Sequence, residues 1–144
     1  KAVIIITRWS NIENIDIAQD LLEFINKLGA EVILIEQPPE LYFGEYNAPQ
    51  FLAYLDLKPA DNSNKYINDL NSAQYQNGRA LIREISSRYS FCNYAPIRDI
   101  FIKNNKVWVI DNFNVLYIDD DHLSQQGALK VKPVIFKRLN DLFP

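Results

Sequence analysis

The chain has 144 residues, of which 48% are hydrophobic and 12% aromatic, and its formal net charge at pH 7 is −3. This length and composition predict one folded domain, residues 1–144, and exclude a disordered chain. The negative charge and the scattered lysines and arginines exclude the basic surface of a nucleic-acid-binding protein, and no apolar run is long enough to span a membrane, so we expect this piece to be soluble.

The chain has one cysteine, Cys92, and no methionine. A single cysteine cannot form a disulfide within the chain. The sequence opens directly on the strand-like run KAVIIIT, and we therefore expect it to be the downstream part of a longer polypeptide. A chain trimmed closely at a domain edge is the alternative.

The first forty residues have the pattern of a β-α-β unit. Residues 2 to 7 form a continuous apolar and β-branched run, which is typical of a strand buried on both faces. Apolar residues then recur at helical spacing from Ile12 to Leu28. Residues 32 to 35 form a second buried strand, which the two prolines at 38 and 39 end.

Residues 40 to 62 show no sustained period, and we expect an irregular excursion with one short helix at residues 48 to 54. The excursion is rich in aromatic residues. They are expected either to pack as a cap over the edge of the sheet or to form a platform on which sugar rings stack. The cap is favoured because aromatic side chains are more often found in a core.

The rest of the chain is expected to contain two helices and three strands: a helix at 64–88 interrupted at Asn77-Gly78, a strand at 89–94, hairpin strands at 106–110 and 115–118, and a closing helix at 129–143. Pro133 is expected either to kink the closing helix or to start its longer half. Helices that alternate with strands predict an α/β fold with a mainly parallel sheet.

The stretch YIDDDHLSQQGA, residues 117 to 128, holds the only histidine of the chain. An aspartate three residues before a histidine can curl under the imidazole within one turn. Asp119 would then accept a hydrogen bond from Nδ1 of His122 and leave Nε2 as a general base. Asp120 and Asp121 are expected to be solvated, and Ser124 is expected to cap the following helix rather than act as a nucleophile.

Two other interpretations of this stretch stay open. It can be an exposed acidic turn without chemistry, because matches of this length occur by chance. It can also be a divalent metal site with carboxylate and imidazole ligands. We expect no metal, because three adjacent side chains should not all point at one ion and the chain has no second histidine.

The run LYIDDDHLSQQGA resembles the Asp-x-x-His block of SGNH (GDSL-like) hydrolases, and most of all the SGNH domains fused to membrane acyltransferase family 3 proteins. The early stretch VIIITRWS is similar to the strand and loop that carry an oxyanion-hole block in other SGNH enzymes. The resemblance covers most of the chain in order, and only its terminal block is specific.

The resemblance implies a three-layer α/β/α, flavodoxin-like fold that lacks its N-terminal strand and helix in this sequence. Residue by residue, it implies that Asp119 and His122 are the acid and base of a Ser-His-Asp triad. Arg8, Trp9 and Ser10 would form a substrate or oxyanion loop of the same site. The family's Gly-Asp-Ser nucleophile segment is missing, so the serine is expected upstream of residue 1.

The function that the resemblance implies is a serine esterase or O-acetyltransferase acting on bacterial surface polysaccharide such as O-antigen or lipopolysaccharide. A carbohydrate would be the acceptor, and a fused or partner membrane acyltransferase domain would supply the acetyl group. The domain would face the periplasm from an inner-membrane protein and would need no cofactor. A non-catalytic α/β glycan-binding or interaction domain is the rival function.

Overall fold

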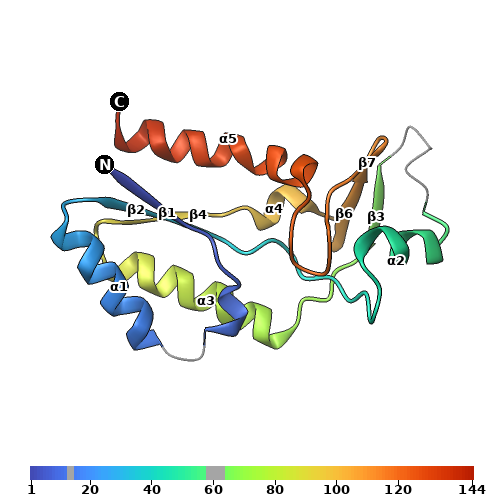
Figure 1. Cartoon of the computed structure of the whole chain (residues 1–144), viewed down its shortest axis with the longest axis horizontal. Coiled ribbons are helices and arrows are strands. Elements are labelled where there is room, and N and C mark those ends of the chain that lie inside the picture. Colours follow the sequence, from blue (N-terminus) through green and yellow to red (C-terminus); the bar gives the residue numbers. More distant parts are fainter. Residues whose placement is uncertain (13–14, 58–63) are drawn as a thin grey trace. The chain divides into compact units, whose positions relative to one another are not determined.

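The computed structural model describes residues 1–12, 15–57 and 64–144. Its contacts divide the chain into two compact units, each described by itself below. Unit 1 comprises Lys1–Gln37, Ala73–Ile97 and Val134–Pro144, and unit 2 comprises Pro38–Ser72 and Arg98–Pro133. Figure 1 labels the helices and strands.

Unit 1 contains a parallel three-stranded sheet with the order β1-β2-β4 (Ala2–Ile5, Glu31–Ile35 and Cys92–Ala95). Helices α1 (Ile15–Lys27) and α3 (Ala73–Arg88) lie on one side of this sheet, and the part of α5 from Val134 onward lies on the other (Figure 1). The predicted α/β fold with a parallel sheet is therefore confirmed.

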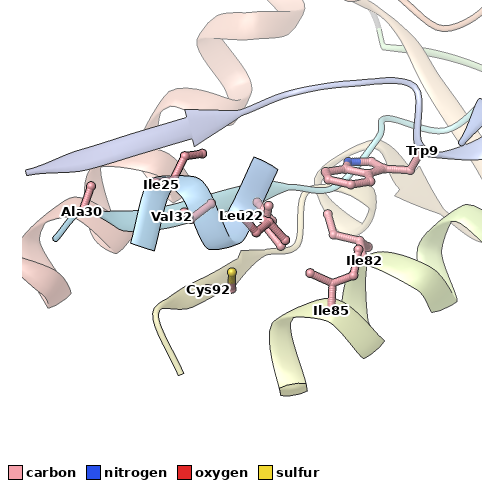
Figure 2. Close-up of a cluster of buried hydrophobic side chains, with 9 residues drawn as sticks. Trp9, Leu22, Ile25, Ala30, Val32, Ile82, Ile85 and Cys92 are labelled. Carbon is pink, nitrogen blue, oxygen red and sulfur yellow. The ribbon is translucent and has the colours of Figure 1, made fainter. Parts of the chain in front are cut away.

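The core of unit 1 lies between its helices and the central strand. Val32 and Leu34 of β2 belong to one buried cluster with Leu22 of α1 and Ile82 of α3. Figure 2 shows Val32, Leu22 and Ile82 in this cluster. Cys92 is buried in the same cluster, and this burial, together with the charge of Glu31, raises the pKa of its thiol to about 11. A thiol with this pKa is protonated and unreactive at neutral pH.

Strand β1 lies at the edge of the sheet, and the prediction that it is buried on both faces is wrong. Val3 is 36%, Ile4 42% and the following Ile6 66% exposed, whereas every residue from Val32 to Ile35 in β2 is buried. The apolar run of the first strand is therefore typical of a central strand, but among the described residues no strand pairs with its outer edge.

Helix α1, like strand β1, exposes apolar side chains to solvent. Leu22 and Ile25 of this helix are buried in the core, as its helical periodicity predicts. The outer side of the helix is also apolar, because Leu21, Phe24 and the following Leu28 are all exposed. These three residues are three and four positions apart, so they form one stripe.

Unit 2 contains an antiparallel sheet of four short strands: β3 (Lys65–Asn68), β5 (Ile102–Lys103), β6 (Lys106–Asp111) and β7 (Asn114–Val115). The predicted hairpin is confirmed as β6-β7, although its second strand is shorter than expected. The predicted helix at 64–88 is wrong over residues 64–72. Tyr66 there pairs with Trp108 of β6, and the two rings stack, which favours a strand.

The predicted short helix is confirmed as α2 (Ala48–Tyr54). Asn47 caps it in a capping box with Gln50, and Pro49 occupies its first turn, where no backbone N–H is needed. Leu41 and Phe43, before the helix, and Leu52 within it are buried. The end of the expected excursion, residues 58–62, lies outside the described residues.

The closing helix α5 (Gln125–Leu142) begins earlier than predicted and continues through Pro133. It begins at Gln125 because Ser124 caps it, with the Gly127 N–H donating to the serine Oγ at 3.2 Å. This confirms the expected role of Ser124. Another short helix, α4 (Arg98–Phe101), precedes β5 in unit 2, and Arg98 forms an ion pair with Asp69.

Helix α3 is continuous across Asn77-Gly78, where an interruption was expected. Instead, Gly78 lets the backbone of another segment pack closely against the helix. A Cβ at Gly78 would lie 2.6 Å from the backbone nitrogen of Ser10 and 2.7 Å from the backbone carbon of Trp9. Only a residue without a side chain lets α3 pack directly on the short 3-10 helix η1 (Trp9–Asn11).

Gly78→Ala should therefore destabilise the chain, by about 1–3 kcal/mol, because the methyl group overlaps backbone atoms that cannot move aside. An ordinary glycine-to-alanine change within a helix raises the free energy of unfolding by up to about 1 kcal/mol. A decrease would therefore distinguish the close packing at Gly78 from the ordinary effect. Urea unfolding measures the change, with Asn77→Ala at the neighbouring exposed position as control. Equal or greater stability of Gly78→Ala would contradict the predicted packing.

Candidate active site

His122 and Asp119 form a hydrogen-bonded pair in unit 2. Nδ1 of His122 lies 2.9 Å from Oδ1 and 3.0 Å from Oδ2 of Asp119, so it donates its proton to this carboxylate. Nε2 then carries the lone pair. The imidazole side chain is 72% exposed, so Nε2 is accessible to a reacting group.

The backbone around the pair fixes the position of Asp119. Its Oδ1 accepts the backbone N–H of Asp121 at 3.1 Å and that of His122 at 2.8 Å. Such a turn, closed by an aspartate side chain, is a stable local structure. The Ile118 N–H also donates to the carbonyl of His122, and Tyr117 pairs with Leu123, so the whole loop is closed at its base.

The start of α5 anchors this loop. The hydroxyl of Ser124 donates to the carbonyl of Val115 at 2.6 Å, and its backbone N–H donates to Leu116. Gly127 packs on the same strand end, since a Cβ there would lie 2.1 Å from the carbonyl oxygen of Leu116. The sequence after the histidine therefore holds the loop in place, and Ser124 is committed to this structural role.

Asp121 is a second carboxylate beside the imidazole. Its side chain is only 4% exposed, and its Oδ1 lies 2.9 Å from Nδ1 of His122. The prediction that Asp121 is solvated is therefore wrong. Neighbouring residues usually point in different directions, but the tight turn over Asp119 bends the chain enough to bring positions 119, 121 and 122 together.

The two carboxylates control the charge of the pair. The hydrogen bond to Asp119, and then the charge of Asp121, raise the pKa of His122 above its ordinary value of 6.5. Partial burial would raise the pKa of Asp119, but the amides of His122 and Asp121 outweigh it, so this pKa lies below its ordinary value of 3.8. An ionised carboxylate thus faces a basic imidazole, as a general base requires.

The same residues also meet the geometric condition for a metal site. One ligand atom from each of Asp119, Asp121 and His122 lies within 4.8 Å of the others. The expectation that adjacent side chains cannot converge is wrong for this set. The nitrogen that converges on the carboxylates is Nδ1, which already donates to Asp119, so the geometry equally fits an oriented imidazole.

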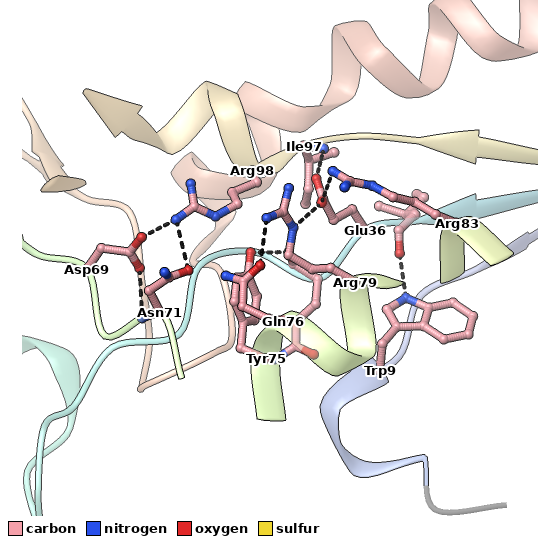
Figure 3. A network of polar contacts seen from close by, with 12 residues as sticks. Trp9, Glu36, Asp69, Asn71, Tyr75, Gln76, Arg79, Arg83, Ile97 and Arg98 are labelled. Atoms are coloured by element: carbon pink, nitrogen blue, oxygen red, sulfur yellow. Dashed lines mark hydrogen bonds and ion pairs between the residues drawn. The ribbon is translucent and has the colours of Figure 1, made fainter. Parts of the chain in front are cut away.

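Arg8, Trp9 and Ser10 lie in unit 1, at the carboxyl end of β1. The ring of Trp9 is buried in the core, and its indole N–H donates to the carbonyl of Ile35 at 2.7 Å (Figures 2 and 3). The Ser10 N–H donates to Oε1 of Gln37 at 3.2 Å. Arg8 is the exposed member of the three.

The segment Ile35–Gln37, at the end of β2, holds this loop. The buried Glu36 accepts Arg79 at 2.6 Å and the N–H of Ile97 at 2.9 Å, which ties β2 to α3 and to the end of β4 (Figure 3). Tyr75 donates to the carbonyl of Gln37 at 3.2 Å. The carboxyl ends of all three parallel strands are thus linked, at the edge where α/β folds place their sites.

The candidate residues lie in both units: Asp119 and His122 in unit 2, and Arg8, Trp9 and Ser10 in unit 1. The sequence pattern alone did not reveal the roles of Asp121, Glu36 and Gln37. Glu36 and Gln37 directly follow a buried strand, and polar residues at that position are a usable signal. Asp121 has no such signal, because its role depends on the turn.

Comparison with known proteins identifies the kind of domain. A family model described as "SGNH domain (fused to AT3 domains)" matches residues 1–137. No curated protein and no solved structure matches the chain. Within the described part of the chain, no helix is long and apolar enough to cross a membrane.

Asp121→Asn should lower the pKa of His122, because it removes a negative charge that stabilises the imidazolium. We expect a decrease toward the ordinary pKa of the imidazole, measured by NMR titration of the single histidine ring. Asp120→Asn is the matched control, since the charge of Asp120 has a smaller effect on the pKa of His122 than the charge of Asp121. An equal decrease in both variants, or none in Asp121→Asn, would contradict the assigned geometry.

Proposed function

Because the chain belongs to the family of SGNH domains fused to AT3 domains, we propose that it is a serine esterase or O-acetyltransferase domain acting on a bacterial surface polysaccharide. The family is one of hydrolases and acyltransferases, so membership supports acetyl-group chemistry. The single observation that carries the proposal is the oriented Asp119–His122 pair, in the block that resembles the family's Asp-x-x-His motif.

In the proposed mechanism, Nε2 of His122 takes the proton from a serine Oγ as that oxygen attacks the acetyl carbonyl carbon. The imidazolium, stabilised by Asp119, returns the proton to the leaving oxygen as its bond to carbon breaks. A carbohydrate hydroxyl or water then loses its proton to Nε2 and attacks the acetyl-serine. The serine leaves with that proton, which restores the starting state.

The serine is proposed to come from a segment that precedes Lys1 in the natural polypeptide. The sequence contains no Gly-Asp-Ser. Strand β1 is at the edge of the described parallel sheet, and its apolar side chains Val3 and Ile4 are exposed, which supports a further strand paired with it. If that strand were parallel, its carboxyl end would lie beside the loop at Arg8.

The three loop residues have different proposed roles. The indole N–H of Trp9 and the backbone N–H of Ser10 donate to Ile35 and Gln37. We therefore propose that these two groups position the loop rather than hold an oxyanion. Arg8 is proposed to be the loop residue that faces the substrate. A guanidinium there would stabilise negative charge on the reacting acetyl oxygen.

The proposed setting is an inner-membrane protein with this domain in the periplasm. The family's fusion to AT3 domains supports a domain of a membrane protein. An AT3 domain, fused or in a partner, would supply the acetyl group, and a sugar hydroxyl of O-antigen or lipopolysaccharide would accept it. The proposed steps involve protein side chains alone, without a metal or a soluble cofactor.

His122→Ala and Asp119→Ala in the longest polypeptide that the gene encodes should each lower kcat/KM for acetyl-ester turnover. The expected loss for His122→Ala is about 10²- to 10⁴-fold, the usual contribution of a general base. Because the His122 side chain is mostly exposed, its removal leaves no cavity and the fold should be unchanged.

Asp120→Ala is the control and should retain turnover, since the charge of Asp120 has the smallest of the identified effects on the pKa of the imidazole. Circular dichroism checks that each variant is folded. Full turnover in His122→Ala would contradict the catalytic proposal and would favour the rival, a non-catalytic glycan-binding domain.

A further inference from the structure

Three exposed tyrosines lie in the segment that flanks the His122 loop within unit 2. Tyr42 is 73%, Tyr46 49% and Tyr54 72% exposed. We call them the tyrosine surface. The neighbours of Tyr42 differ from it in exposure, since Leu41 and Phe43 are almost fully buried.

The tyrosine surface is tied to the His122 loop by backbone hydrogen bonds. The Leu41 N–H donates to the carbonyl of Asp120 at 2.8 Å, and the Ala48 N–H donates to the carbonyl of Ile118 at 3.0 Å. These bonds fix both ends of the segment 41–48 against the loop that carries the imidazole. Tyr42 and Tyr46 therefore lie on a segment that borders the proposed reacting group.

The rings are held by the local structure. Tyr46 and Tyr54 stack at a centroid distance of 5.8 Å with an interplanar angle of 17°. Tyr54 ends α2, whose start is fixed by the capping box, and Phe43 packs on Phe51 of the same helix at 4.8 Å. An aromatic surface with fixed orientation loses little conformational freedom when a ligand binds.

The chemistry of the surface fits a sugar ring. The face of a phenol ring is negative and attracts the slightly positive C–H groups on the face of a pyranose. The phenol hydroxyls and the exposed carboxylate of Glu45 offer hydrogen bonds to the sugar hydroxyls at the rim. A stable protein interface buries about 800 Å² per partner and would need a larger surface than three side chains.

We propose that the tyrosine surface binds a pyranose ring of the carbohydrate acceptor by stacking, with Tyr46 and Tyr54 as the main platform and Tyr42 nearer the His122 loop. This inference rests on the proposed function, because it names the subsite that holds the sugar for that same reaction. It takes up the alternative that the sequence left open, in which the aromatic excursion forms a platform for sugar rings.

The test is an NMR titration of the longest polypeptide that the gene encodes, with labelled tyrosine rings, against methyl β-D-glucopyranoside. All ring hydroxyls of this probe are equatorial, so both of its faces present C–H groups. The ring signals of Tyr46 and Tyr54 should shift and saturate at millimolar sugar. Tyr54→Ala should weaken binding about five- to tenfold. Phe113→Ala, at an aromatic residue that is 60% exposed in the β6-β7 turn, should leave the affinity unchanged.

Three outcomes would overturn the proposal. The first is no shift of the tyrosine ring signals up to 100 mM sugar, which is roughly the weakest binding that stacking gives. The others are equal weakening of sugar binding by Phe113→Ala, and ring shifts that follow the concentration of protein instead of sugar. The last would show a second copy of the chain on this surface. The titration needs no turnover. If the tyrosine signals shift with sugar but the protein does not turn over acetyl esters, the proposed function alone is refuted. If acetyl esters are turned over but the tyrosine signals do not shift, this inference alone is refuted.

Discussion

The candidate site depends on one interaction, the hydrogen bond from Nδ1 of His122 to Asp119. It fixes the tautomer, leaves Nε2 exposed as a base and requires an ionised carboxylate beneath the ring. The loop between β7 and α5 is built to hold it: Asp119 closes the turn, and Ser124 and Gly127 pin the loop to the strand end. Asp121 adds a buried charge that makes the imidazole more basic.

A second constraint operates at the carboxyl end of the parallel sheet in unit 1. Polar groups of Ile35, Glu36 and Gln37 accept hydrogen bonds from Trp9, Ile97 and Ser10, so the loops that follow all three strands are fixed together. A carboxylate buried as deeply as Glu36 is stable only with such partners. The loop at Arg8 therefore has a defined conformation before any ligand binds.

The sequence predicted what local patterns determine and missed what tertiary packing determines. The helix at 48–54 and the cap at Ser124 follow from short-range rules, and both are confirmed. The strand at Lys65–Asn68 was missed, because its pairing with β6 is a long-range contact. Gly78 was misinterpreted as a helix interruption, because nothing local reveals the backbone of Ser10 against it.

Fluorophosphonate labelling followed by peptide mass spectrometry tests the central claim, that His122 activates a serine. Applied to the longest polypeptide that the gene encodes, it should place the adduct on a serine that precedes Lys1, and labelling should slow by about 10²-fold or more in His122→Ala. An adduct on Ser10 or Ser124, no adduct, or an unchanged labelling rate in His122→Ala would contradict the account.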